Sequence, residues 1–220
     1  MDKKESYRDF ISEIEKRKIE YLIHFTPTIN LYSILEQGKI MSRASLECLD
    51  IEQFDVLDYI QFTDNVRYDD KNYINLSISS PNTFLFTKFR ERTIEDPTIT
   101  WCVLKIKPKH IYDRDTKFAV TNAASNAAKS VGVTGDLQKF KLLFSDKIDI
   151  PYGTRNQIHP RFTTNIQAEV LVKNQIPNDS IIEICFDSDE SLASAKAALC
   201  EFDTSNFVVD KNIFSPNRSL

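Results

Sequence analysis

The stretch RFTTNIQAEVLVKNQIP, residues 161–177, places a glutamate at the head of an apolar run. Residues 170–172 are aliphatic and mostly β-branched, and Pro177 closes the segment, so the pattern predicts a buried β-strand. An ionised carboxylate beside such a strand is costly unless it has a partner or a chemical task. Glu169 is therefore either half of a structural ion pair or a catalytic group.

The charge on either side of this strand is unevenly distributed, although the net charge of the whole chain is only −4. Residues 137–165 hold five lysines and arginines against two aspartates, an excess of three, whereas residues 187–203 are acidic. A polyanion would be tolerated near the first segment and repelled by the second. Ordinary solvated faces would give the same pattern.

The pattern of apolar residues along the whole chain predicts an α+β protein. Helices are expected over residues 6–19, 29–37, 51–60, 137–146 and 191–200, with a loop entering another helix in 117–132. Strands are expected over residues 21–26, 72–79, 99–108, 167–172 and 181–186, and the apolar run 83–89 also places aromatic residues at strand spacing. Residues 149–165 are polar and rich in turns, and we expect a loose tail after residue 200.

Composition narrows the class of protein further. A chain of 220 residues with 41% hydrophobic content can bury one sizeable core. The four cysteines are scattered and have no metal-ligand spacing with the three histidines, which favours reduced thiols over disulfides or a zinc site. The first 18 residues are charged throughout, and no apolar run reaches the length of a membrane span. We therefore expect a cytoplasmic protein without a metal or a membrane partner.

Few recognisable site motifs are present. The chain has no GxGxxG, P-loop, GxSxG or HExxH motif, and four glycines leave little for a phosphate-binding loop. What remains is His24 and Thr26 at the end of a strand, an isolated Arg67, and Glu169. Because His24 and Thr26 are two residues apart in a strand, their side chains face the same way.

These residues, in their order, resemble the DarT-type ADP-ribosyltransferases. The resemblance covers roughly residues 21–186 and is carried by "HFT", "NLYSILEQGKI", an arginine ahead of "YINLSISSPN", "WCVLKIKP", "NAAS" and "QAEVLVKNQIP". Members of this family are toxins that modify bases of single-stranded DNA and are held in check by a macrodomain-containing antitoxin. Where thymidine-modifying members read something like "YFxPRNPM", this chain has "NLSISSPNTFLF", so the target base stays open between guanine and thymine.

The resemblance implies a fold and a domain plan. The fold would be an α+β ADP-ribosyltransferase fold, with a split mixed or antiparallel sheet, flanking helices and an NAD cleft. Residues 1–20 would form a helical extension, 21–186 the transferase domain, and 187–220 a C-terminal helix and tail that are packed on the same domain or trail from it. NAD would be a substrate, and no metal would be needed.

The resemblance also assigns residues. Transfer of ADP-ribose breaks the nicotinamide–ribose bond through an oxocarbenium-like transition state, which a carboxylate such as Glu169 would stabilise. Arg67 would either bind the pyrophosphate or help to deprotonate the base, and its high pKa makes the second role demanding. The predicted NAD contacts are His24, Thr26, Asn30, Arg67 and Ser77, and the predicted acceptor contacts, in a loop of about residues 150–168, are Arg155, Arg161 and Gln167.

Other readings remain open. The acceptor could be an RNA base or a protein, and the chain could be a catalytically dead NAD- or nucleic-acid-binding module that keeps the fold. A small nuclease would need clustered acidic ligands, for which Asp69 and Asp70 are the only adjacent pair near the proposed centre. Tyr73, Phe84 and Phe86 could stack on nicotinamide or on a base, or could belong to the core.

Overall fold

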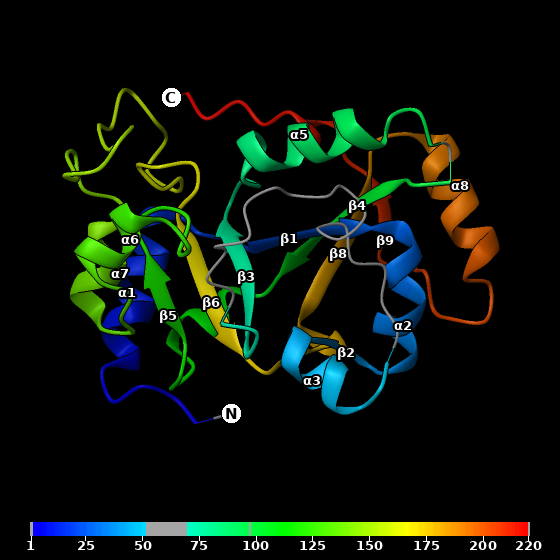
Figure 1. Ribbon diagram of the computed structural model, residues 1–220, viewed down its shortest axis with the longest axis horizontal. Helices are drawn as coiled ribbons and strands as arrows, with labels where there is room; N and C mark the ends of the chain where they lie inside the picture. Colours follow the sequence, from blue (N-terminus) through cyan, green and yellow to red (C-terminus); the bar gives the residue numbers. More distant parts are fainter. Residues whose placement is uncertain (1, 52–69, 97, 220) are drawn as a thin grey trace.

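The centre of the molecule is a seven-stranded sheet with the strand order β5-β6-β3-β1-β4-β8-β9 (Figure 1). The computed structural model describes residues 2–51, 70–96 and 98–219. The strands are β1 (Leu22–Pro27), β3 (Tyr73–Ile78), β4 (Trp101–Ile106), β5 (Lys117–Ala119), β6 (Glu169–Lys173), β8 (Ile181–Phe186) and β9 (Phe207–Val209). Neighbouring strands are antiparallel except β8 and β9, which are parallel. The expected mixed sheet of an α+β fold is confirmed.

Helices lie around this sheet, and a small second sheet pairs β2 (Lys39–Met41) with β7 (Gln175–Pro177). The helices are α1 (Tyr7–Arg17), α2 (Leu31–Glu36), α3 (Arg43–Cys48), α5 (Thr83–Thr93), α6 (Asn126–Val131), α7 (Leu137–Leu142), α8 (Asp189–Ala198) and α9 (Lys211–Phe214). The expected helix at the start of the chain is present, because Phe10 and Ile14 of α1 lie one turn apart and are both buried. Gly38, with φ +66°, lies directly after the end of α2, where a left-handed residue is needed.

The sheet is split between β1 and β3. β1 pairs with β4 at all six of its positions, from Leu22 to Pro27. It pairs with β3 only at Leu22 and Ile23, whereas β3 on its other side pairs with β6 at four positions. The two strands therefore separate from His24 onward, and the side chains at this opening come from both halves of the sheet.

The largest core cluster covers one face of the sheet, and an aromatic cluster under α5 covers part of the other. In the aromatic cluster the rings of Phe25 and Phe86 stack at 4.6 Å, and Phe89 stacks on Trp101 at 5.9 Å. Phe25 lies between His24 and Thr26 in β1, so its packing against α5 turns its two neighbours to the opposite face.

The strand-like reading of residues 83–89 is wrong, because these residues form the first part of α5. The side chain of Asn82 accepts a hydrogen bond from the backbone N of Leu85 at 3.1 Å and so caps the helix. Phe86 and Phe89, three residues apart, then share the buried face, while Phe84 is 53% exposed. Phe86 is consequently a core residue and is not available to stack on a ligand.

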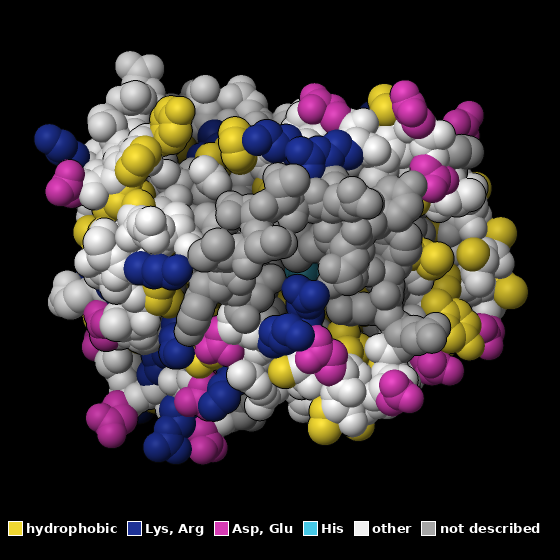
Figure 2. Space-filling model, viewed as in Figure 1, with side chains coloured by type: hydrophobic (Ala, Val, Ile, Leu, Met, Phe, Trp, Pro, Cys, Tyr) yellow, Lys and Arg dark blue, Asp and Glu magenta, His cyan; other side chains and the backbone are white. Residues whose placement is uncertain are grey.

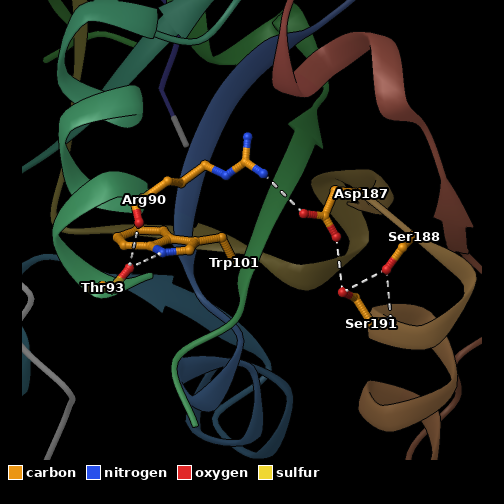
Figure 3. A network of polar contacts seen from close by, with 6 residues as sticks. All are labelled: Arg90, Thr93, Trp101, Asp187, Ser188 and Ser191. Carbon is orange, nitrogen blue, oxygen red and sulfur yellow. Dashed lines mark hydrogen bonds and ion pairs between the residues drawn. The ribbon is translucent and has the colours of Figure 1, made fainter. Parts of the chain in front are cut away.

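The end of the chain is also ordered, contrary to expectation. β9 extends the sheet, and α9 buries Ile213 and Phe214. Figure 3 shows how α5 is joined to the segment that starts α8: Arg90 pairs with Asp187 at 3.1 Å, and the other carboxylate oxygen of Asp187 accepts a hydrogen bond from Ser191. These contacts make residues 187–214 part of the same packed unit as the sheet.

The helix expected over 51–60 and the site residue Arg67 lie outside the described residues. Of the helices that the structure does describe, none combines the length and the apolar character needed to cross a lipid bilayer.

Candidate active site

Glu169 is the first residue of β6 and is 8% exposed. Its neighbours Val170 and Val172 point into the largest core cluster, so the alternation of the strand turns Glu169 to the other face. Across the sheet it lies opposite Ala119 of β5. The expected strand is therefore present, and the carboxylate stands at its first position.

Both carboxylate oxygens of Glu169 accept hydrogen bonds from amide groups. Oε1 accepts from Nδ2 of Asn75 at 3.3 Å, and Oε2 accepts from the backbone N of Ala123 at 2.8 Å. Asn75 comes from β3 and Ala123 from the loop after β5, so two separate elements hold the side chain. A carboxylate that accepts at both oxygens is held in one orientation, as a group that stabilises a developing positive charge should be.

His24 joins the same group through Asn75. Its Nδ1 lies 3.2 Å from the backbone oxygen of Asn75. A carbonyl oxygen can only accept, so Nδ1 carries the proton and Nε2 is left as an acceptor. Burial lowers the pKa of His24, and the hydrogen bond to Asn75 opposes that shift, so the ring is neutral at pH 7. Asn75 thus links the predicted NAD contact to the predicted catalytic carboxylate.

Thr26 and Asn30 are hydrogen-bonded to each other and line one cavity with His24. Nδ2 of Asn30 donates to Oγ1 of Thr26 at 3.0 Å, and with His24 they line a cavity of about 60 Å³ that also touches Lys39 and Met41 of β2. Pockets for whole ligands measure roughly 300 Å³ or more. This cavity can therefore hold only one end of a molecule the size of NAD.

Ser77, the remaining described NAD candidate, lies in β3 opposite Ile23, at the last pair before β1 and β3 separate. It is 8% exposed and shares the strand face of Asn75. Its predicted contact with NAD stays a prediction.

The acceptor candidates lie in the loop before β6. Arg155 forms hydrogen bonds within that loop. Its guanidinium donates to the backbone oxygens of Phe162 at 2.8 Å, His159 at 2.9 Å and Ile158 at 3.2 Å. Burial lowers the pKa of Arg155, and the charge of Arg17 adds to this effect. Arg155 therefore shapes the loop, and its contact with the acceptor stays a prediction.

Arg161 and Gln167 occupy different parts of the same loop. The guanidinium of Arg161 lies 4.8 Å from the ring centroid of Phe162, and its Nε is buried without a hydrogen-bond partner among the residues that the structure describes. The backbone N of Gln167 donates to the side chain of Asn165 at 2.8 Å, two residues before Glu169. The backbone of Gln167 is thus fixed by Asn165.

Asn75 is the site residue that sequence reasoning missed. The signal was present in "YINLSI", where polar residues at 73, 75 and 77 alternate with apolar residues at 74, 76 and 78. Such alternation in a buried strand marks one face as polar. That this face meets Glu169 follows only from the pairing of Asn75 with Leu171, two residues after Glu169.

The family model described as "ssDNA thymidine ADP-ribosyltransferase, DarT" matches residues 23–215. The chain belongs to the DarT family. The predicted resemblance and enzyme class are confirmed, because the family is one of ADP-ribosyltransferases that act on single-stranded DNA. A comparison with proteins of curated function finds no match.

Solved structures of DarT proteins share the fold. Thermus sp. 2.9 DarT in complex with NAD+ gives a TM-score of 0.59 at 15% identity and covers 90% of this chain and 98% of its own. The same protein in complex with ADP-ribosylated ssDNA gives 0.58 at 14% identity, covering 90% and 97%. Thermosipho africanus DarTG in complex with ADP-ribose gives 0.59 at 17% identity and covers 89% of this chain but 51% of its own.

A metal site has no support in the described part of the chain, where no group of three or more His, Cys, Asp or Glu side chains could hold a metal ion. Asp69, half of the acidic pair considered for a nuclease, lies outside the described residues.

Substitution of His24 tests its place in the site. We expect His24→Ala to weaken NAD binding up to about tenfold, the size of one lost hydrogen bond, without changing the base that is modified. Because the pKa of His24 lies below its usual 6.5, NAD affinity of the native protein should be constant above that pH. Affinity should then fall, by up to about tenfold per pH unit, once the ring is protonated and Nε2 no longer accepts. Calorimetric titration of NAD between pH 5 and 8 measures both effects.

His24→Gln, which keeps an acceptor but cannot titrate, is the control and should show a flat pH profile. Equal NAD affinities for the native protein and His24→Ala would instead make His24 a packing residue.

Proposed function

We propose that this protein transfers ADP-ribose from NAD to a base of single-stranded DNA, thymine being the base that the family description prints, and that it acts as a toxin. The observation that carries this proposal is the double contact of Asn75. Its backbone carbonyl binds His24, and its side chain binds Glu169. One residue thereby fixes the distance between the groups expected to hold the ribose and to stabilise its positive charge.

In this proposal NAD lies over the opening between β1 and β3. Nε2 of His24 accepts a hydrogen bond from a ribose hydroxyl, and the carboxylate of Glu169 stabilises the oxocarbenium-like transition state. The bond between nicotinamide and ribose breaks, nicotinamide leaves, and the base forms the new bond to the same ribose carbon and loses a proton. Arg67 would bind the pyrophosphate or assist that proton loss.

The acceptor strand would approach along the loop before β6 and the neighbouring α5. Figure 2 shows Lys and Arg side chains gathered along the upper edge of this face, over α5, which carries Lys88, Arg90 and Arg92. Exposed Phe84 lies under Lys88 at 4.0 Å and offers a surface on which a base could stack. A single strand presents unpaired bases without the cost of flipping them out of a duplex.

The acceptor is tested by offering labelled NAD with single-stranded DNA, duplex DNA, RNA and a protein lysate, then mapping the labelled atom by mass spectrometry. We expect label on single-stranded DNA, and the modified base decides between thymine and guanine. Label on RNA alone would move the proposal to an RNA base, and label only on protein would overturn the nucleic-acid assignment.

The role of Arg161 is tested by salt. If its guanidinium contacts a phosphate, Arg161→Gln should flatten the dependence of log affinity on log salt by about 0.7 for a single strand, without changing the modified base. Arg114→Gln is the matched control, because Arg114 is exposed and pairs only weakly with Asp2 at 3.6 Å. An unchanged slope with a relaxed base preference would assign Arg161 to a base edge instead.

We also propose that the protein acts in the cytoplasm and that a macrodomain antitoxin removes ADP-ribose from the modified DNA. Expression of the protein alone should arrest bacterial growth, and co-expression of such a hydrolase should restore it. Harmless expression of active protein would remove the toxin role but not the enzymatic one.

A further inference from the structure

Arg218 and Ser219 pack against the loop that precedes β6, the strand that begins with Glu169. Ser219 forms an antiparallel bridge with Ile158, and the backbone N of His159 donates to the oxygen of Arg218 at 3.0 Å. In Figure 1 the red C-terminal segment runs past α5 and ends beside the yellow-green loop. These residues lie beyond position 215, where the match to the family model ends.

Arg218 closes this contact with its side chain. Its Nη2 donates to the backbone oxygen of Thr163 and lies 3.4 Å from the hydroxyl of the same residue. Its guanidinium also lies 5.4 Å from the ring centroid of Phe162, which is 1% exposed. Arg155 holds the same turn through the carbonyl of Phe162. Two guanidinium groups thus clamp one turn of the loop.

A chain of hydrogen bonds runs from this clamp to the catalytic strand. The hydroxyl of Thr163 donates to the backbone oxygen of Asn165 at 2.7 Å. That same oxygen accepts from the backbone N of Ala168 at 3.2 Å, and the side chain of Asn165 accepts from Gln167 at 2.8 Å. Glu169 directly follows Ala168. These hydrogen bonds therefore connect Arg218 to the part of the acceptor loop that lies next to the carboxylate in the sequence.

The guanidinium of Arg218 is a buried charge and needs hydrogen-bond acceptors. Burial lowers the pKa of Arg218 to about 10, and the nearby charge of Arg155 adds to this effect. No carboxylate in the described part of the chain pairs with either guanidinium, and their partners are loop oxygens. A buried charge is tolerated when it is hydrogen-bonded, so the loop oxygens and Arg218 hold each other in place.

We propose that residues 217–219 are a strap that positions the acceptor loop for transfer, with Arg218 as its positioning residue. The strap rests on the proposed function, because it acts on the same loop. It holds the loop from residues that lie outside the match to the family model. It affects the acceptor side of the site while leaving NAD binding to His24, Thr26 and Asn30.

The test compares Arg218→Met, a chain ending at residue 215, and the control Arg114→Met, whose side chain is 72% exposed. Three readouts are taken for each: hydrolysis of NAD without DNA, kcat and KM for transfer to a single-stranded oligonucleotide, and hydrogen exchange at the amides of Gln167 and Ala168. For the first two variants we expect kcat/KM for transfer to fall about tenfold or more, the size of a lost charge-assisted hydrogen bond, with faster exchange at both amides. NAD hydrolysis should stay within about twofold, and Arg114→Met should match the native protein throughout.

Parallel loss of hydrolysis and transfer would show a merely structural role and overturn the strap, as would native-like transfer in both variants. If Arg218→Met lowers the Tm markedly, Arg218→Lys replaces it, because lysine keeps the charge but lacks the fork of donors. If Arg218→Lys recovers part of the transfer, the result supports the strap. If it recovers no transfer while NAD hydrolysis stays normal, the result shows that the strap needs the fork of guanidinium donors. A native protein that labels no nucleic acid would overturn the proposed function, and the strap with it.

Discussion

Transfer of ADP-ribose is expected to fall by about 10²–10³-fold or more in Glu169→Gln, with the fold intact. The substitution keeps the shape of the side chain but removes its negative charge. It also points an NH₂ group at one of two donors, because the oxygens of Glu169 accept from Asn75 and from Ala123. Steady-state transfer onto a single-stranded oligonucleotide, with circular dichroism to check the fold, measures the effect.

Glu183→Gln is the matched control for this prediction. Glu183 also lies in a strand, but it pairs with Lys105 at 2.8 Å, and Lys105 has a second partner in Asp210 at the same distance. Because that glutamate belongs to a structural ion pair, its loss should leave transfer close to native. Expression of the native protein should be toxic and that of Glu169→Gln harmless. Near-native transfer by Glu169→Gln would return Glu169 to the structural reading.

The largest expected effect on stability belongs to Phe86→Ala, which should lower the free energy of unfolding by about 3–5 kcal/mol. Phe86 is 1% exposed, stacks on Phe25 at 4.6 Å, and also packs against Trp101 and Phe214. Truncation would leave a cavity between α5 and β1 that rigid aromatic neighbours cannot fill. Urea unfolding followed by tryptophan fluorescence measures the change.

Phe84→Ala controls for the loss of a phenyl ring on the same helix. Phe84 is 53% exposed and its ring is covered by Lys88, so its removal should change the free energy of unfolding by no more than about 1 kcal/mol. Equal destabilisation by the two substitutions would mean that residues 83–89 do not bury one helical face.

The local pattern of apolar and polar residues determined several strands of this protein and the faces on which their side chains lie. The alternation around Val170 and Val172 is a property of adjacent residues, so both the strand and the position of Glu169 at its head could be predicted. The same reasoning placed His24 and Thr26 on one face of β1. It failed at residues 83–89, where aromatic spacing fits both a strand and a helix until the side chain of Asn82 caps the helix.

The links between these residues were decided only by tertiary structure. Asn75 can bind both His24 and Glu169 because β3 lies between β1 and β6, an order that does not follow the chain. Arg218 reaches Thr163 across 55 positions of sequence. Side-chain periodicity records which face of its own element a residue occupies, but it contains no information about which distant element lies opposite. That choice comes from the pairing of strands and the burial of the whole core, so the site as a connected group exists only in the folded chain.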